Sequence, residues 1–383
     1  MVVPLAGRVI AAIVGGVLVI AAGRSVIQTI IVPRPANRWL IRTVDQMVNG
    51  AFHLVATLVK DHKRRDAVLA SQAAAVLLVQ LITWLACFFV GYSLLLWPFL
   101  HGGITRAFTT VGPGLWFIGN SHVQGGWERA IQDMASLTGL ITITLQISYL
   151  PTLYSAFNRR EVDIALLNAR AGVPSWGPEL LARTHYALGS GSSTVDTLPG
   201  LYEQWERFAA DIAESHTAYL PLVRFRSPRP LSSWVTGLLA VLDSAALYLA
   251  LSPEAAPIVP ARLCLRSGFL CFGEIARAMR LKVPESPDPD GGISLTYEDF
   301  LDAVRRMEEV GFPFERKPEE AWPDFVGWRV NYEQAAYAIA QAVDAVPALW
   351  SGPRRHHDRP IPPIRPPAGR VPKDKLKKKQ FAG

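Results

Sequence analysis

Long apolar stretches in the first 150 residues predict three membrane-spanning helices. The first runs from Val9 to Val32, and the second, from Ala73 to Leu96, contains no charged residue. The third, from Ala130 to Tyr149, is more polar, with Asp133 near its start and several Thr, Ser and Gln. Each is long enough, because about 20 residues of helix cross the hydrocarbon core. The composition of the third predicts a helix that faces other protein or a water-filled path rather than lipid.

The distribution of Lys and Arg predicts how these spans are oriented. Residues 34–72 carry seven Lys/Arg, residues 101–128 carry only Arg106, and Arg159-Arg160 follow the third span. Because cytosolic loops are enriched in Lys and Arg, residues 34–72 and the C-terminal half are expected in the cytosol. The first stretch also fits a cleaved signal peptide, but cleavage would export the basic loop, so a retained span in the inner membrane is favoured.

The basic loop between the first two spans contains an amphipathic pattern. Polar and charged residues lie between apolar residues that recur at helical spacing. The apolar residues are Leu40, Val44, Met47, Val48, Phe52, Val55, Leu58 and Val59. This pattern predicts a helix that lies along the membrane surface and contacts lipid. A helix that packs on the cytosolic domain is the alternative.

The C-terminal half reads as a series of helices separated by Pro and Gly. We expect helices near 160–171, 176–188, 197–220, 231–251, 259–282, 296–310 and 330–346, and no strands. Segment 231–251 is apolar enough for a fourth span, but Asp243 at its centre would be costly in lipid. A buried helix of a cytosolic domain is therefore the preferred interpretation.

Composition limits the classes of function. Half of the residues are hydrophobic and 19% are charged, which suits a few spans plus a cytosolic part. The net charge of +7 does not indicate nucleic-acid binding, because residues 352–383 hold ten Lys/Arg against two Asp, a net +8. Cys87, Cys264 and Cys271 form neither a disulfide framework nor a metal site. No catalytic constellation or cofactor motif is recognised, so no enzyme, cofactor or metal is expected.

The segment between the second and third spans is apolar for an external loop. This arrangement is typical of a re-entrant pore loop, which leaves helical structure at membrane depth only where protein or a cavity surrounds it. Phe108 to Gly114 reads FTTVGPG, close to the TTVGYG filter of potassium channels. Too few residues precede it for a pore helix. We therefore expect the pore helix at Ile104 to Leu115 and the filter position at Phe117 to Ser121.

Residues 73–150 resemble the bacterial two-helix potassium channels. The resemblance rests on Trp127-Glu128-Arg129 and on Gly139, a hinge glycine ten residues past Arg129. It extends less sharply to bacterial proteins grouped with the two-pore-domain channels, through Tyr149-Leu150-Pro151-Thr152-Leu153-Tyr154 and Arg159-Arg160-Glu161. The resemblance implies a homotetramer that conducts a monovalent cation, potassium above all.

The filter position departs from the family pattern. The five residues are Phe117, Ile118, Gly119, Asn120 and Ser121, so the threonine, the tyrosine and the second glycine of the filter are replaced. A less selective or silent pore is therefore expected. The pore wall is predicted along the third span, at Thr138, Gly139, Thr142, Ile143, Gln146 and Ile147. The alternative is that Thr and Gln hydrogen-bond across packed helices.

These observations predict an all-α, multi-pass integral membrane protein with a potassium-channel-like pore module, an extra N-terminal span and a helical cytosolic domain. The leading function is passive cation conduction, and the alternative is a non-conducting sensor or scaffold. The predicted parts are an N-terminal span (1–33), a basic linker with an interfacial helix (34–72), a pore module (73–156, with spans 73–99 and 129–150 around a pore loop 103–122), a helical cytosolic domain (157–350) and a disordered basic tail (351–383).

Overall fold

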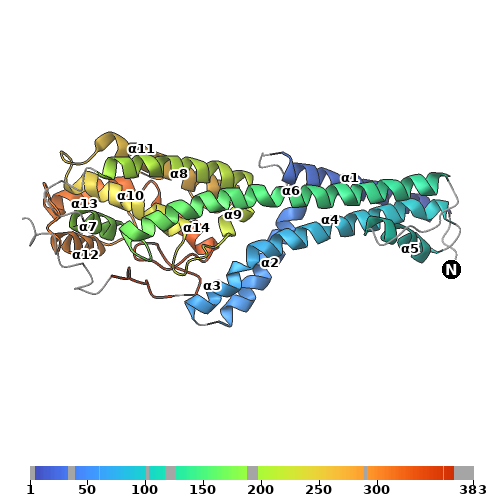
Figure 1. Ribbon diagram of the computed structural model, residues 1–383, viewed down its shortest axis with the longest axis horizontal. Helices are drawn as coiled ribbons and strands as arrows, with labels where there is room; N and C mark the ends of the chain where they lie inside the picture. The colour runs from blue at the N-terminus through green and yellow to red at the C-terminus, as the bar shows by residue number, and fades with distance from the viewer. Residues whose placement is uncertain are drawn as a thin grey trace, which may run out of the picture. The chain divides into compact units, whose positions relative to one another are not determined.

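The computed structural model describes residues 5–32, 39–59, 61–100, 103–116, 126–187, 197–288, 291–356 and 358–365. Over these residues the protein is mostly helical and has no strand, apart from an isolated bridge between Ala348 and Ile361 (Figure 1). The chain divides into two compact units. Unit 1 comprises residues 1–159 and 214–226, and unit 2 comprises residues 160–213 and 227–383.

Unit 1 contains the long apolar helices of the first half of the chain. Its elements are α1 (Leu5–Ile30), α2 (Trp39–Thr57), α3 (His62–Ala70), α4 (Gln72–Leu96), a 3-10 turn η1 (Trp97–Phe99), α5 (Ile104–Leu115), the first part of α6 (Gly126–Ala171), the last residues of α8 (Leu198–Ala218) and α9 (Pro221–Arg224).

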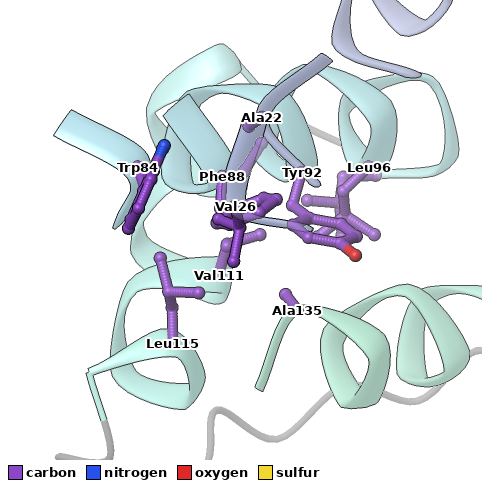
Figure 2. Close-up of a cluster of buried hydrophobic side chains, with 11 residues drawn as sticks. Ala22, Val26, Trp84, Phe88, Tyr92, Leu96, Val111, Leu115 and Ala135 are labelled. Atoms are coloured by element: carbon purple, nitrogen blue, oxygen red, sulfur yellow. The ribbon is translucent and has the colours of Figure 1, made fainter. Parts of the chain in front are cut away.

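Helices α1 and α4 pack closely because glycines face each other. A Cβ added at Gly15 would lie 2.5 Å from the carbonyl oxygen of Gly91, so neither position accommodates a side chain. Further along, the indole Nε1 of Trp84 donates to Ser25 Oγ at 3.1 Å. Figure 2 shows the apolar cluster that α1 and α4 share with α5 and α6, in which the labelled side chains point toward one another. Small residues at the contact therefore let two apolar helices meet at backbone distance.

Unit 2 is built around α10 (Trp234–Leu251), every residue of which is buried. The helices around it are the last part of α6, α7 (Gly177–Ala187), α8, α11 (Ile258–Ala278), α12 (Tyr297–Glu308), α13 (Pro318–Arg329) and α14 (Glu333–Ala342). The Asp243 carboxylate, at the middle of α10, pairs with Arg329 and accepts a hydrogen bond from Tyr332 Oη at 2.9 Å. The one charge of the helix is therefore compensated within the protein core.

Among the residues that the structure describes, four helices are long and apolar enough to cross a membrane: residues 6–30, 62–99, 126–171 and 234–251. The most apolar windows of the first three lie mostly exposed on the protein, whereas that of α10 is entirely covered by it. A helix enclosed by protein has no surface to offer lipid, which favours the interpretation of α10 as a core helix. The three stretches predicted as spans are confirmed as long apolar helices, and their length and composition support a membrane protein.

Helix α6 differs from the prediction in its length. It continues without interruption from Gly126 to Ala171, so it passes through Pro151 and well beyond Tyr149, where the predicted span ends. The helix predicted near 160–171 is therefore the end of α6 rather than a separate element. Proline removes one hydrogen bond but, in an otherwise helical segment, need not end the helix.

The C-terminal segment also corrects the prediction, because residues 351–356 and 358–365 belong to unit 2 rather than to a disordered tail. Arg354 is buried, and its guanidinium donates to the carbonyl oxygens of Ala345 (2.6 Å), Val346 (2.8 Å) and Ser351 (2.7 Å). The backbone N–H of Ile364 donates to Val173 O at 2.9 Å. These hydrogen bonds, of which the one to Val173 is long-range, fix a segment whose composition alone reads as disordered.

One buried carboxylate of unit 2 gathers three arginines. Glu179 in α7 accepts from Arg183 Nε at 2.8 Å, from Arg306 Nε at 2.7 Å and from Arg365 Nε at 3.1 Å. Burial by itself would raise the pKa of Glu179, but the hydrogen bonds from Arg306 and Arg183 outweigh it and lower the pKa below its usual range. The cluster ties α7, α12 and the C-terminal segment together.

We expect this cluster to make unit 2 sensitive to acid. Because the pKa of Glu179 is lower in the folded than in the unfolded protein, its stabilisation is present above the unfolded pKa, about 4.3, and is lost as the pH falls through the folded value. Glu179→Gln should therefore lower the denaturation midpoint at neutral pH and flatten its decline toward acid. Denaturant titrations of both proteins from neutral pH down to about pH 3 check this, and parallel declines would contradict it.

Candidate functional site: the α4–α5–α6 module

Helix α5 is a short helix between two long apolar ones, with the bounds predicted for the pore helix. It runs from Ile104 to Leu115 and buries Ala107, Thr110, Val111, Gly114 and Leu115. On one side Phe108 packs against Phe89 of α4, with ring centroids 5.2 Å apart. The TTVGPG stretch lies within this helix and is thus not an extended filter loop.

Gly114 of that stretch and Gly139 of α6 allow the two helices to pack closely. A Cβ added at Gly114 would lie 2.5 Å from Ser136 Oγ of α6, and one added at Gly139 would lie 2.9 Å from the Leu115 carbonyl oxygen. Gln132 Nε2 also donates to Thr110 O across the same contact, at 3.4 Å. The end of α5 therefore rests directly on the backbone of α6, and Gly139, the predicted hinge, lies in this contact.

The predicted filter residues Phe117, Ile118, Gly119, Asn120 and Ser121 lie outside the described residues. Their assignment stays a prediction, resting on the sequence and on the observed position of α5 before them.

The predicted pore-wall residues do not share one surface. Thr142 and Gln146 are buried within the chain, and Thr138 Oγ1 is hydrogen-bonded to Tyr92 Oη of α4 at 2.8 Å. Ile143 is half-buried, and Ile147 is 62% exposed. The hydroxyl of Thr142 donates to the carbonyl of Thr138, one turn earlier in the same helix. For Thr138 and Thr142 this placement favours a role in helix packing, which was the alternative left open.

A set of polar side chains on α4 was missed by the sequence analysis. Gln80 and Ser93 are buried in the apolar helix α4, and neither the Nε2 atom of Gln80 nor the Oγ atom of Ser93 has a hydrogen-bond partner within the described residues. On α6 the same holds for the Oε1 atom of Gln146. Gln80 and Gln146 each lie three residues from a member of one cluster, Leu77 and Tyr149. The signal in the sequence was a lone Gln within an apolar run.

We call Gln80, Ser93 and Gln146 the unpaired polar residues. A buried polar atom without a partner costs about 1–3 kcal/mol and is rare in native proteins, so each instance calls for an explanation. In a membrane-spanning segment such atoms mark places where water, an ion or another chain supplies the missing hydrogen bond. The described residues contain no group of three or more His, Cys, Asp or Glu that could hold a metal ion.

Comparison of the chain with known proteins identifies no relative: no family model, no curated protein and no solved structure matches it.

Proposed function

We propose that α4, α5 and α6 form a channel-like module for passive conduction of monovalent cations, potassium above all, in a homo-oligomer. Two long apolar helices with a short helix between them are the layout of a pore module, and the residues after α5 are those expected at a filter. One such set cannot enclose a path, so several copies surround it, four by resemblance to the two-helix channels.

The observation that carries this proposal is the presence of the unpaired polar residues. Gln80, Ser93 and Gln146 put polar atoms without partners inside helices that are otherwise suited to lipid. Unpaired polar groups of this kind are expensive in a membrane and are typical of substrate and ion pathways. A helical anchor with no transport role would gain stability from apolar residues at these positions.

A non-conducting sensor or scaffold is the second candidate. Thr142 is buried and back-bonded within α6, and Gly139 is covered by Leu115, so these positions on α6 serve packing in each chain. The filter position also lacks the threonine, the tyrosine and the second glycine. A protein that kept the fold and lost the filter would show both features.

Cation flux from liposomes that contain the purified full-length protein distinguishes a conducting channel from a non-conducting sensor or scaffold. We expect potassium flux that exceeds sodium flux only modestly, and its loss in Gly119→Val, since a β-branched residue there disturbs the filter backbone. The matched control is Gly126→Val, at a glycine with open space around it, which should conduct normally. Absence of flux from a verified oligomer, at several pH values and potentials, would contradict conduction and favour the scaffold.

A further inference from the structure

The helical hairpin formed by α2 and α3 has one face packed and one face free. Val44, Val48 and Phe52 of α2 pack against the start of α4, at Val76 and Val79. The contact is reinforced by polar bonds, among them one from Gln72 Nε2 of α4 to Asn49 Oδ1 at 2.7 Å. Figure 1 shows α2 beside α3 at the beginning of α4. The hairpin is therefore held at the end of a candidate membrane span.

The free face of α2 carries an apolar stripe, by which we mean Met47, Ala51 and Leu54 of the helix and Leu58 in the turn that follows it. Met47 and Leu54 are each 69% exposed and Leu58 is 80% exposed. Met47, Ala51 and Leu54 follow one another at helical spacing, over about 10 Å at 1.5 Å per residue, and Leu58 comes one residue after the end of the helix. Large exposed apolar side chains gathered on one face mark an interaction surface rather than chance exposure. Gln46 and Thr57, also exposed, border the stripe on its polar side.

The charges beside the stripe are mainly basic. Lys63 and Arg64 of α3 are exposed, whereas the carboxylates of Asp45 and Asp66 are each paired with an arginine, Arg224 and Arg226 respectively. The carboxylate of Asp61 accepts the backbone N–H of Arg64 and caps α3. Two of the three carboxylates are thus compensated by arginines, and the exposed Lys63 and Arg64 outnumber Asp61, so the net outward charge is positive.

We infer that the apolar stripe of α2, together with Lys63 and Arg64, binds the surface of an anionic bilayer. An amphipathic helix with aliphatic residues on one face and basic residues beside it inserts that face at the boundary of headgroups and acyl chains. Each Lys or Arg near an anionic surface adds about 1 kcal/mol. The hairpin is covalently continuous with α4, a candidate span, so it cannot leave the membrane. The sequence pattern did not distinguish the two faces of α2. In the structure, Val44 and Val48 pack on α4, whereas Met47 and Leu54 stay exposed.

The test places a spin label on the stripe in the full-length protein, reconstituted in nanodiscs. Leu54→Cys carries the label, and Gln46→Cys on the polar side of the same helix is the matched control. Unmodified protein gives the background, since Cys264 and Cys271 are buried and Cys87 is half-buried. We expect a severalfold higher ratio of oxygen to nickel-chelate accessibility at 54 than at 46 in discs that contain phosphatidylglycerol. The ratio at 54 should fall in purely zwitterionic discs, and also when Lys63→Glu and Arg64→Glu are combined.

Three results would overturn the inference. Equal nickel access at 54 and 46 would mean that the stripe faces water. Protection of the label at 54 from both reagents would mean that protein, a second copy or another partner, covers the stripe. A ratio of oxygen to nickel accessibility at 54 that is the same in anionic and zwitterionic discs would mean that binding does not require anionic lipid. None of these results depends on whether the protein conducts ions, so they are read independently of the flux experiment.

Discussion

Replacing Arg329 with methionine should lower the free energy of unfolding of unit 2 by about 3–5 kcal/mol. The guanidinium is fully buried, and it pairs with Asp243 and with Glu333 Oε1, the latter at 3.0 Å. Its Nη2 atom also donates to Tyr337 Oη at 2.9 Å and to Trp350 O at 2.7 Å. Without it, two buried carboxylates lose the guanidinium that compensates their charge.

Denaturant unfolding of the full-length protein in detergent, followed by tryptophan fluorescence, measures this loss. The control is Arg316→Met, whose partner Asp324 is about half exposed, where we expect a loss of about 0–1 kcal/mol. If Arg329→Met does not fold, Arg329→Lys provides the measurement, because lysine keeps the charge but not the planar fork of donors. A loss below about 1 kcal/mol for both Arg329 variants would show that Asp243 and Glu333 are stabilised by other groups.

The apolar helices of this protein could be predicted from sequence because length and composition decide them. The bounds of α4 and α5 match the prediction closely, and α10, where Asp243 argued against a lipid-facing helix, is buried along its whole length. In each case one local property was decisive: an uncharged run of sufficient length, or a charge that lipid does not accept.

Elements fixed by distant contacts were not predictable in the same way. Helix α13 (Pro318–Arg329) was missed because Pro323 and Gly327 lie inside it and its apolar residues show little helical periodicity. The segment around Arg354 was predicted to be part of a disordered tail. Its prolines and arginines do not reveal that the guanidinium hydrogen-bonds to buried carbonyl oxygens. Tertiary packing and long-range hydrogen bonds overrode local composition at both places.

The predicted pore wall on α6 illustrates a different limit of prediction from sequence. Thr and Gln on a membrane helix suit both a water-filled wall and a packed contact, because the same hydroxyl and amide groups satisfy either role. Sequence spacing grouped Thr142 with Ile147, whereas the structure buries the first and exposes the second. Only the positions of the neighbouring helices, α4 and α5, decide which side of α6 is covered.

Replacing Gly15 with valine should separate α1 from α4 and destabilise unit 1 by about 1–3 kcal/mol, the usual cost of overpacking. A Cβ at this position would lie 2.5 Å from Gly91 O and 2.8 Å from Leu95 N. Both are backbone atoms of α4, so no rotation of a side chain relieves the clash. The helices must move apart, and the hydrogen bond from Trp84 to Ser25 weakens with them.

The matched control is Gly23→Val in the same helix, where no atom lies within 4 Å of an added Cβ. Both variants place the same β-branched residue in α1, so they share any change in helix propensity and differ only in the contact with α4. We expect the thermal midpoint in detergent to fall for Gly15→Val and to stay near that of the unmodified protein for Gly23→Val. Equal midpoints would mean that α1 does not approach α4 at Gly91, and the close crossing at the centre of unit 1 would have to be abandoned.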